Sequence, residues 1–226
     1  MIAVDAGMDE RYTWSNPAYA YTMQSLEREI LRLLLTHRLF PLAGRRVLEV
    51  GCGRGYWMRE WVKWGADPEQ VTGADLRPDS VRWARRVSPA GSGVLAADAA
   101  HLPFPTDHFD IVFQSTVFTS ILDSGTRAAA AGEMLRVVRR SGVILWYDFI
   151  FDNPANPGVR GVTLAELRRL FVPYSPTIRR VTLAPPLTRR LVPRATWLAR
   201  VAERIPLLRT HCLAILRKTE TSKLVQ

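Results

Sequence analysis

Three glycines that follow a short apolar run are the residues best suited to hold a ligand close to the backbone. The run is Val47–Val50, and the glycines are Gly51, Gly53 and Gly55. Glycine lets a chain turn sharply and approach a ligand, and free amides at the start of the next helix favour anionic groups. The loop is not the dinucleotide pattern G-x-G-x-x-G, because Tyr56 stands where its third glycine would be. Taken alone, the glycines are also compatible with a structural turn.

Polar side chains at the ends of the next apolar runs strengthen the case for a binding site. Asp75 ends the second run, where an acid can bind the two hydroxyls of a ribose. Asp98 follows the third run and Gln114 ends the fourth. Ligands of open parallel sheets bind at the carboxyl ends of the strands, and all of these residues fall there. Each residue alone could be a cap or core residue, but their joint order favours one shared site.

A catalytic base is not assigned from the sequence. Tyr147 and Asp148, at the end of the fifth run, are the best placed candidates. Tyr147 is equally compatible with plain core, and Asp148 with a loop cap. Cys52 and Cys212 form no CxxC pair and no zinc set, so no metal is expected.

The elements that must position these residues alternate between apolar runs and helix-like stretches. The predicted strands are 47–50, 71–74, 93–97, 111–114, 143–149, 178–183 and 212–216, and the predicted helices are 25–35, 56–64, 79–87, 126–138 and 164–171. Such alternation is typical of a doubly wound sheet with crossover helices. We therefore predict an α/β fold with a mostly parallel, seven-stranded sheet.

The charge of the chain is concentrated near one end. The net charge is +10, yet residues 1–157 carry 17 basic and 18 acidic side chains, while residues 158–226 carry 14 and 3. A basic segment indicates an anionic partner such as nucleic acid, a membrane surface or a phosphorylated substrate. Because Arg outnumbers Lys 28 to 3, a coding bias towards Arg explains the excess equally well.

Other totals exclude several classes of protein. At 47% hydrophobic residues the chain can bury a core and is not disordered. No apolar run approaches the ~20 residues of a membrane-spanning helix. The first residues include acids and no apolar stretch, so no signal peptide is expected, and a cytoplasmic location is predicted.

Over about residues 45–150 the motifs resemble the class I S-adenosylmethionine-dependent methyltransferases, particularly their small-molecule group called type 11. The loop Glu49-Val-Gly51-Cys-Gly53-Arg-Gly55 is similar to that family's first motif, which borders the methionine part of the cofactor. The resemblance implies that S-adenosylmethionine is bound by Glu49, Gly51, Cys52, Gly53, Gly55, Asp75, Leu76, Asp98, Ala99 and Gln114. Among these, Asp75 would hold the ribose, Leu76 would lie beside the adenine, Asp98 and Ala99 would contact its edge, and Gln114 would line the pocket. The family's usual Pro-Gly-Gly turn is replaced by Arg140-Ser141-Gly142.

The same resemblance implies a Rossmann-like fold with an N-terminal helical lid and a helical insert before the last strand. We expect a single domain, 1–226, with a cap at 1–44, a cofactor-binding core at 45–150 and a basic C-terminal part at 151–226 that completes the sheet. The insert is expected at about 185–206. The candidate substrate contacts are Tyr12, Trp14, Thr116 and Tyr147.

The expected reaction is methyl transfer by in-line displacement to a small-molecule or lipid- or glycan-linked acceptor, with S-adenosylhomocysteine as product. One alternative is a nucleic-acid methyltransferase, although Gln114-Ser-Thr-Val replaces the Asn/Asp-Pro-Pro-Tyr/Phe motif common in adenine amino methylation. A second is a catalytically silent cofactor-binding protein. The apolar stripe Trp197, Val201 and Ile205, flanked by arginines, indicates peripheral contact with an anionic membrane. No obligate protein partner is expected.

Overall fold

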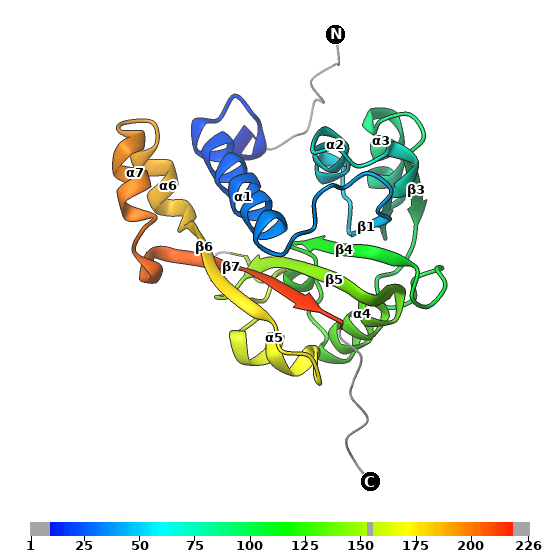
Figure 1. Cartoon of the computed structure of the whole chain (residues 1–226). Coiled ribbons are helices and arrows are strands. Elements are labelled where there is room, and N and C mark those ends of the chain that lie inside the picture. Colours follow the sequence, from blue (N-terminus) through cyan, green and yellow to red (C-terminus); the bar gives the residue numbers. More distant parts are fainter. Residues whose placement is uncertain (1–9, 153–155, 219–226) are drawn as a thin grey trace. The chain divides into compact units, whose positions relative to one another are not determined.

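The computed structural model describes residues 10–152 and 156–218, and these form two compact units (Figure 1). The larger unit comprises residues 39–179 and 213–218, and the smaller unit comprises residues 10–38 and 180–212. Strands β6 and β7 each begin in one unit and end in the other.

Seven strands form one mostly parallel sheet in the order β3-β2-β1-β4-β5-β7-β6. The strands are β1 (Val47–Val50), β2 (Val71–Asp75), β3 (Gly93–Ala96), β4 (Phe109–Ser115), β5 (Val138–Phe149), β6 (Thr177–Leu183) and β7 (Arg209–Arg217). In register, Val50 pairs with Ala74 on one side and with Gln114 on the other. The chain winds outwards from β1 to β3 and then in the opposite direction from β4, so the carboxyl ends of β1 and β4 flank a topological switch point. The predicted fold class is confirmed.

Four helices of the larger unit cover both faces of its part of the sheet. They are α2 (Tyr56–Lys63), α3 (Pro78–Val87), α4 (Ser124–Val137) and α5 (Leu164–Leu170). In Figure 1, α2 and α3 lie on one side of β4 and β5, and α4 and α5 lie on the other. Side-chain caps fix two of the helix starts, because Asp123 accepts from the Thr126 amide and Thr163 accepts from the Glu166 amide. The short 3-10 helices η2 (Pro68–Gln70) and η3 (Phe118–Ser120) complete this unit.

Helix α1 (Pro17–Thr36) is the longest element of the smaller unit and starts earlier than predicted. The side chain of Asn16 accepts from the amides of the first turn, and Pro17 has no amide that needs a partner. Asn16 and Pro17 are together a helix-start signal. The prediction of a helix from residue 25 used the apolar spacing alone and did not take this signal into account. The other elements are η1 (Glu10–Tyr12), α6 (Pro185–Leu191), α7 (Thr196–Ala202) and η4 (Pro206–Leu208), so the predicted insert consists of two helices and a 3-10 turn.

The expected turn at Arg140-Ser141-Gly142 lies inside β5. Ser141 has φ 68°, and the pairing of β4 with β5 shifts register beside this point. The Ser141 amide donates to the Lys218 carbonyl, and the Lys218 amide donates to the Gly142 carbonyl. Pairing with Lys218 therefore keeps this segment within the strand, which begins five residues earlier than the predicted Val143.

Within the part of the chain that the structure describes, no helix combines the length and apolar character needed to cross a bilayer.

Candidate functional site

The glycine loop connects β1 to α2 and is fastened to the end of β2. The amides of Gly51 and Cys52 both donate to the Ala74 carbonyl, at 2.7 and 3.0 Å. Gly51 has φ 71°, and a Cβ at this position would overlap the side chain of Val117 in the loop after β4. Only glycine combines this backbone conformation with so close an approach. The loops after β1 and β4 therefore meet at the switch point. The sequence predicted that the residues at these strand ends would share one edge of the sheet.

Asp75 is nearly buried at the end of β2, and its carboxylate braces the glycine loop. One oxygen, Oδ2, accepts from the Gly53 amide at 2.8 Å, and the other, Oδ1, accepts from the Arg77 amide at 2.9 Å. Each carboxylate oxygen can accept a second hydrogen bond. The acid predicted for a ribose is thus held rigidly beside the glycines and keeps free acceptor capacity.

Glu49 is a buried acid inside β1, next to the same loop. Burial raises the pKa of its carboxyl well above the usual value, and the nearby Asp75 charge adds to this, while the Met58 amide opposes it by a hydrogen bond. The Oε2 atom of Glu49 is buried and has no hydrogen-bond partner among the described residues. An unpartnered buried carboxyl oxygen is costly unless a ligand completes it. It is suited to accept from a positively charged group.

Cys52 shares this environment, but its thiol packs against the sheet. Burial, and then the charges of Glu49 and Asp75, raise the pKa of the Cys52 thiol. A Cβ on Gly73 of β2 would lie 2.9 Å from its sulfur, so the thiol fills the space above that glycine. Cys52 is therefore a packing residue whose backbone belongs to the loop, and not a nucleophile.

The expected adenine contacts lie on the neighbouring strand ends. Leu76, directly after Asp75, exposes 68% of its surface. Asp98 follows β3, is exposed, and accepts from the Ala100 amide at 2.9 Å. Ala99, which follows Asp98 in the chain, is half-buried. These residues offer an apolar surface and an acceptor, although their contact with an adenine stays a prediction.

Gln114 and Tyr147 connect the ends of β4 and β5. Gln114 is fully buried; its side-chain nitrogen donates to the Tyr147 carbonyl at 3.1 Å, and its side-chain oxygen accepts from the Val117 amide at 3.0 Å. The Thr116 amide also donates to the Tyr147 carbonyl, at 2.9 Å. Thr116 is half-buried and Tyr147 is buried. These contacts fix the shape of the loop after β4, while direct contact with cofactor or substrate stays a prediction for all three residues.

Asp148, considered above as a base, is fully buried and fixes the same loop. Its oxygens accept from the Thr119 hydroxyl at 2.6 Å, from the Thr119 amide at 3.2 Å and from the Phe149 amide at 3.1 Å. Burial raises the pKa of Asp148 to about 7, although the hydrogen bonds from Thr119 favour its charged form. With its oxygens engaged inside the protein, Asp148 acts as a clamp between β5 and the loop.

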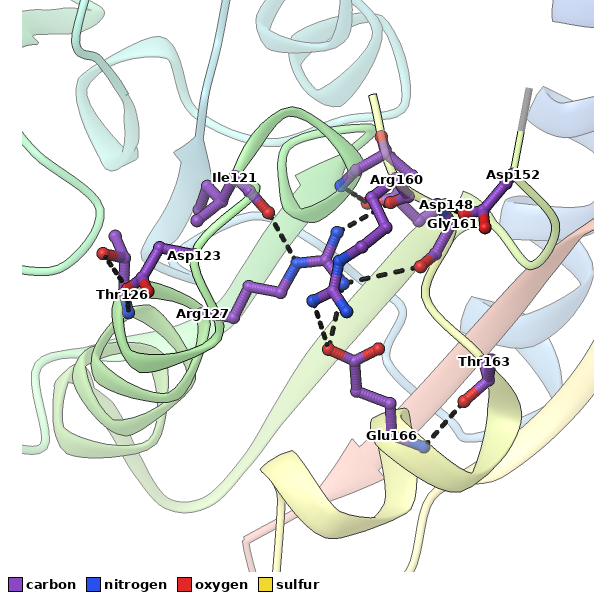
Figure 2. A network of polar contacts seen from close by, with 11 residues as sticks. Ile121, Asp123, Thr126, Arg127, Asp148, Asp152, Arg160, Gly161, Thr163 and Glu166 are labelled. Atoms are coloured by element: carbon purple, nitrogen blue, oxygen red, sulfur yellow. Dashed lines mark hydrogen bonds and ion pairs between the residues drawn. The ribbon is translucent and has the colours of Figure 1, made fainter. Parts of the chain in front are cut away.

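A buried arginine, Arg127 of α4, fastens the segment that follows β5. Its guanidinium donates to the carbonyls of Ile121 and Arg160, both at 2.7 Å, and to Glu166 of α5 at 2.9 Å. Figure 2 shows the guanidinium groups of Arg127 and Arg160 converging on the Glu166 carboxylate. The Arg160 amide in turn donates to the Thr119 carbonyl at 2.9 Å. The network therefore connects two helices to the loop at the candidate site.

The sequence analysis did not single out Arg127, because arginines are mostly exposed and its burial has no local signal. Tyr12 and Trp14, predicted to contact substrate, lie in the smaller unit, where both rings pack edge-on against Tyr19. Their role in a lid stays a prediction.

Among residues 10–152 and 156–218, no cluster of three or more His, Cys, Asp or Glu side chains could hold a metal ion.

Comparison with known families identifies the part of the chain that carries the site. A family model described as methyltransferase domain matches residues 48–146. The match covers just under half of the chain, and over this segment the chain is similar to that family. The match confirms the resemblance that the glycine loop and the acids at the strand ends predicted.

Curated relatives share this methyltransferase domain over part of their length. The chain is 37% identical over 103 residues to the malonyl-acyl-carrier-protein O-methyltransferase of Serratia marcescens, covering 46% of this chain and 38% of that protein. It is 36% identical over 112 residues to the fatty-acid O-methyltransferase of Mycolicibacterium smegmatis, covering 46% and 37% respectively. The chain thus spans about two fifths of the length of these relatives.

Solved structures match the fold over most of the chain. An S-adenosylmethionine-dependent methyltransferase from Mesorhizobium loti superposes with a TM-score of 0.61 at 20% identity, covering 82% of this chain and 96% of that chain. A second, from Archaeoglobus fulgidus, gives 0.61 at 16% identity, covering 88% and 99%. At these identities the likeness establishes the fold, which is the one that S-adenosylmethionine-dependent methyltransferases use.

Proposed function

We propose that this protein transfers the methyl group of S-adenosylmethionine to a small-molecule acceptor, and that the acceptor is an oxygen or carbon nucleophile on a largely apolar molecule. The observation that carries the cofactor assignment is the site around Glu49. A buried carboxyl oxygen that has no partner among the described residues lies beside a glycine loop, and Asp75 borders the same loop. These residues fit a cofactor with a cationic amino-acid end and a ribose.

The protein's own residues bind and orient the reactants. The amides and glycines of residues 51–55 would border the methionine part, the free oxygen of Glu49 would accept from its ammonium, and Asp75 would hold the ribose hydroxyls. When bound, S-adenosylmethionine supplies an activated methyl group that a nucleophile takes by in-line displacement. Catalysis of this kind depends mainly on orientation and on exclusion of water, so no general base is assigned.

Rigid loops at the carboxyl ends of β4 and β5 would form the acceptor side. Gln114 and Asp148 hold residues 116–119 in one conformation, and the Arg127 network holds residues 160–161 against that loop. A fixed wall of this kind keeps the acceptor aligned and limits the entry of water. Thr116 and Tyr147 are the proposed contacts for the acceptor.

The names of the relatives support the class of acceptor. They include methyltransferases of a malonyl-acyl-carrier protein, of fatty acids and of ubiquinone and menaquinone biosynthesis. Each of these names points to an acyl or isoprenoid compound. We therefore extend to this chain an acceptor with an apolar chain and an acidic or phenolic reactive end.

Calorimetry and methyl transfer test the proposal in two stages. Titration with S-adenosylhomocysteine, S-adenosylmethionine and NAD should show binding of the first two and none of NAD. Transfer of labelled methyl groups should then proceed to a fatty acid, an acyl thioester or a quinol. Binding of NAD alone would overturn the cofactor assignment, and labelling of RNA in place of these acceptors would support the nucleic-acid alternative. Cofactor binding without transfer to any acceptor in a whole lipid extract would favour the catalytically silent alternative.

A further inference from the structure

Large apolar side chains are exposed together on the segment from α7 to η4 of the smaller unit. Trp197 exposes 65% of its surface and Leu207 exposes 82%. We call this set the α7 face; its apolar members are Trp197, Leu198, Val201, Ile205 and Leu207. Isolated exposed apolar residues are ordinary, but a group of this size within eleven consecutive positions marks an interaction surface.

The helix itself explains why these side chains point outwards. Ala199 is fully buried in a small core with Tyr21, Leu183 and Val192, and Ala202 packs against the same core. Trp197 and Val201 are four residues apart and so share a face of α7 other than the one that Ala199 occupies. The inner side of α7 is thus satisfied by small residues, and the large residues are left on the outside.

The exposed charged side chains between residues 194 and 207 are all arginines. Arg194, Arg200 and Arg204 are exposed in the same segment. Between residues 180 and 212 the sequence holds seven arginines and one acid, Glu203. Both oxygens of Glu203 accept hydrogen bonds from α1, one from the Tyr21 hydroxyl and one from the Ser25 hydroxyl, each at 2.7 Å. The only carboxylate of the segment is therefore engaged with α1, next to the core, while Arg194, Arg200 and Arg204 face solvent.

We propose that the α7 face docks on a membrane surface that contains anionic lipids. A bilayer interface accepts both components at once, because apolar side chains enter the acyl boundary while arginines extend to the lipid phosphates. Tryptophan is favoured at this depth for the same reason. Nucleic acid would pair with the arginines but would leave the five apolar side chains uncovered. The proposal concerns a surface remote in the sequence from the cofactor loop and does not depend on the proposed acceptor.

Vesicle sedimentation of the full chain tests the docking surface directly. The protein should pellet with vesicles of phosphatidylcholine mixed with phosphatidylglycerol, less with phosphatidylcholine alone, and less as salt is raised. The triple variant Arg194→Gln, Arg200→Gln, Arg204→Gln should bind the anionic vesicles on the order of 100-fold more weakly, from the typical contribution of each basic residue near such a surface. The matched control carries the same charge change at exposed arginines of the larger unit, Arg86→Gln, Arg168→Gln, Arg169→Gln, and should keep most of the binding.

A second pair of variants tests the apolar part. Leu207→Ser should weaken vesicle binding, and Leu35→Ser, at an α1 leucine with 66% exposure, should change it little. Equal binding to both kinds of vesicle, or an unchanged triple variant, would overturn the proposal. A dimer in analytical ultracentrifugation that Leu207→Ser abolishes would assign the face to a second copy of the chain, and would overturn it as well. Titration of S-adenosylhomocysteine on the same variants keeps this outcome separate from the proposed function, since their cofactor affinity should equal that of the wild type.

Discussion

Asp75→Asn separates two roles that the structure gives to one carboxylate. The two oxygens accept from the amides of Gly53 and Arg77. In asparagine one oxygen becomes an NH2 group that cannot accept, so one backbone amide loses its partner. A hydrogen bond to a charged acceptor contributes roughly 1.5–3 kcal/mol. At about 2–4 °C per kcal/mol for a chain of this length, the ligand-free variant should melt roughly 3–12 °C lower.

The same substitution should weaken the binding of S-adenosylhomocysteine by roughly 10- to 100-fold, because the proposed bonds to the ribose hydroxyls lose their charged acceptor. Thermal unfolding without ligand measures the first effect, and titration calorimetry measures the second. Asp79→Asn is the control, since that acid is exposed on α3 and pairs with Arg82 one turn away; surface pairs of this kind contribute little. An affinity as high as that of the control would refute the ribose assignment, and an unchanged melting temperature would refute the bracing of the loop.

Three further predictions concern the rest of the site. Because burial raises the pKa of Asp148 to about 7, the unfolded chain releases this proton at lower pH than the folded chain. The free energy of unfolding of the wild type, relative to that of Asp148→Asn, should therefore fall by up to about 4 kcal/mol as pH rises from about 4 to 7. A difference between the two proteins that stays constant across this range in urea unfolding would contradict the assignment. Arg127→Met should lower the free energy of unfolding in the same assay by about 3–5 kcal/mol, since it leaves buried carbonyls and part of the Glu166 charge without a partner. The control Arg168→Met, on the surface of α5, should change it little, and equal effects of the two variants would show that the network is not structural. Gly51→Ala should bind the cofactor more weakly in calorimetry. The left-handed backbone conformation at position 51 costs residues other than glycine about 1–2 kcal/mol, and the added Cβ meets the loop after β4. An unchanged affinity would show that the two loops need not approach so closely.

Local patterns were sufficient for the fold and for most strand and helix positions. Alternating apolar runs predicted the seven strands, and the register then brings the ends of β1, β2 and β4 to one edge. The errors lie where distant contacts or unused capping signals decide. The start of α1 depends on Asn16 and Pro17, which apolar periodicity does not detect. The extension of β5 through Ser141 depends on pairing with Lys218, at the other end of the described chain.

The sequence by itself determined the chemistry that this protein can offer: glycines after a buried strand, an acid at the end of the next strand, and an arginine-rich segment near the carboxyl end. These features are local, since each follows from residue type and spacing. Tertiary structure alone decided which polar atoms are used up inside the protein and which are left for a partner. Gln114 and Asp148 are engaged internally, and Glu49 keeps one buried oxygen that finds no partner in the described part of the chain. Glu203 turns towards α1 and leaves the arginines of the α7 face uncompensated. Burial and hydrogen-bond partners come from residues far apart in the chain, and no local pattern specifies them.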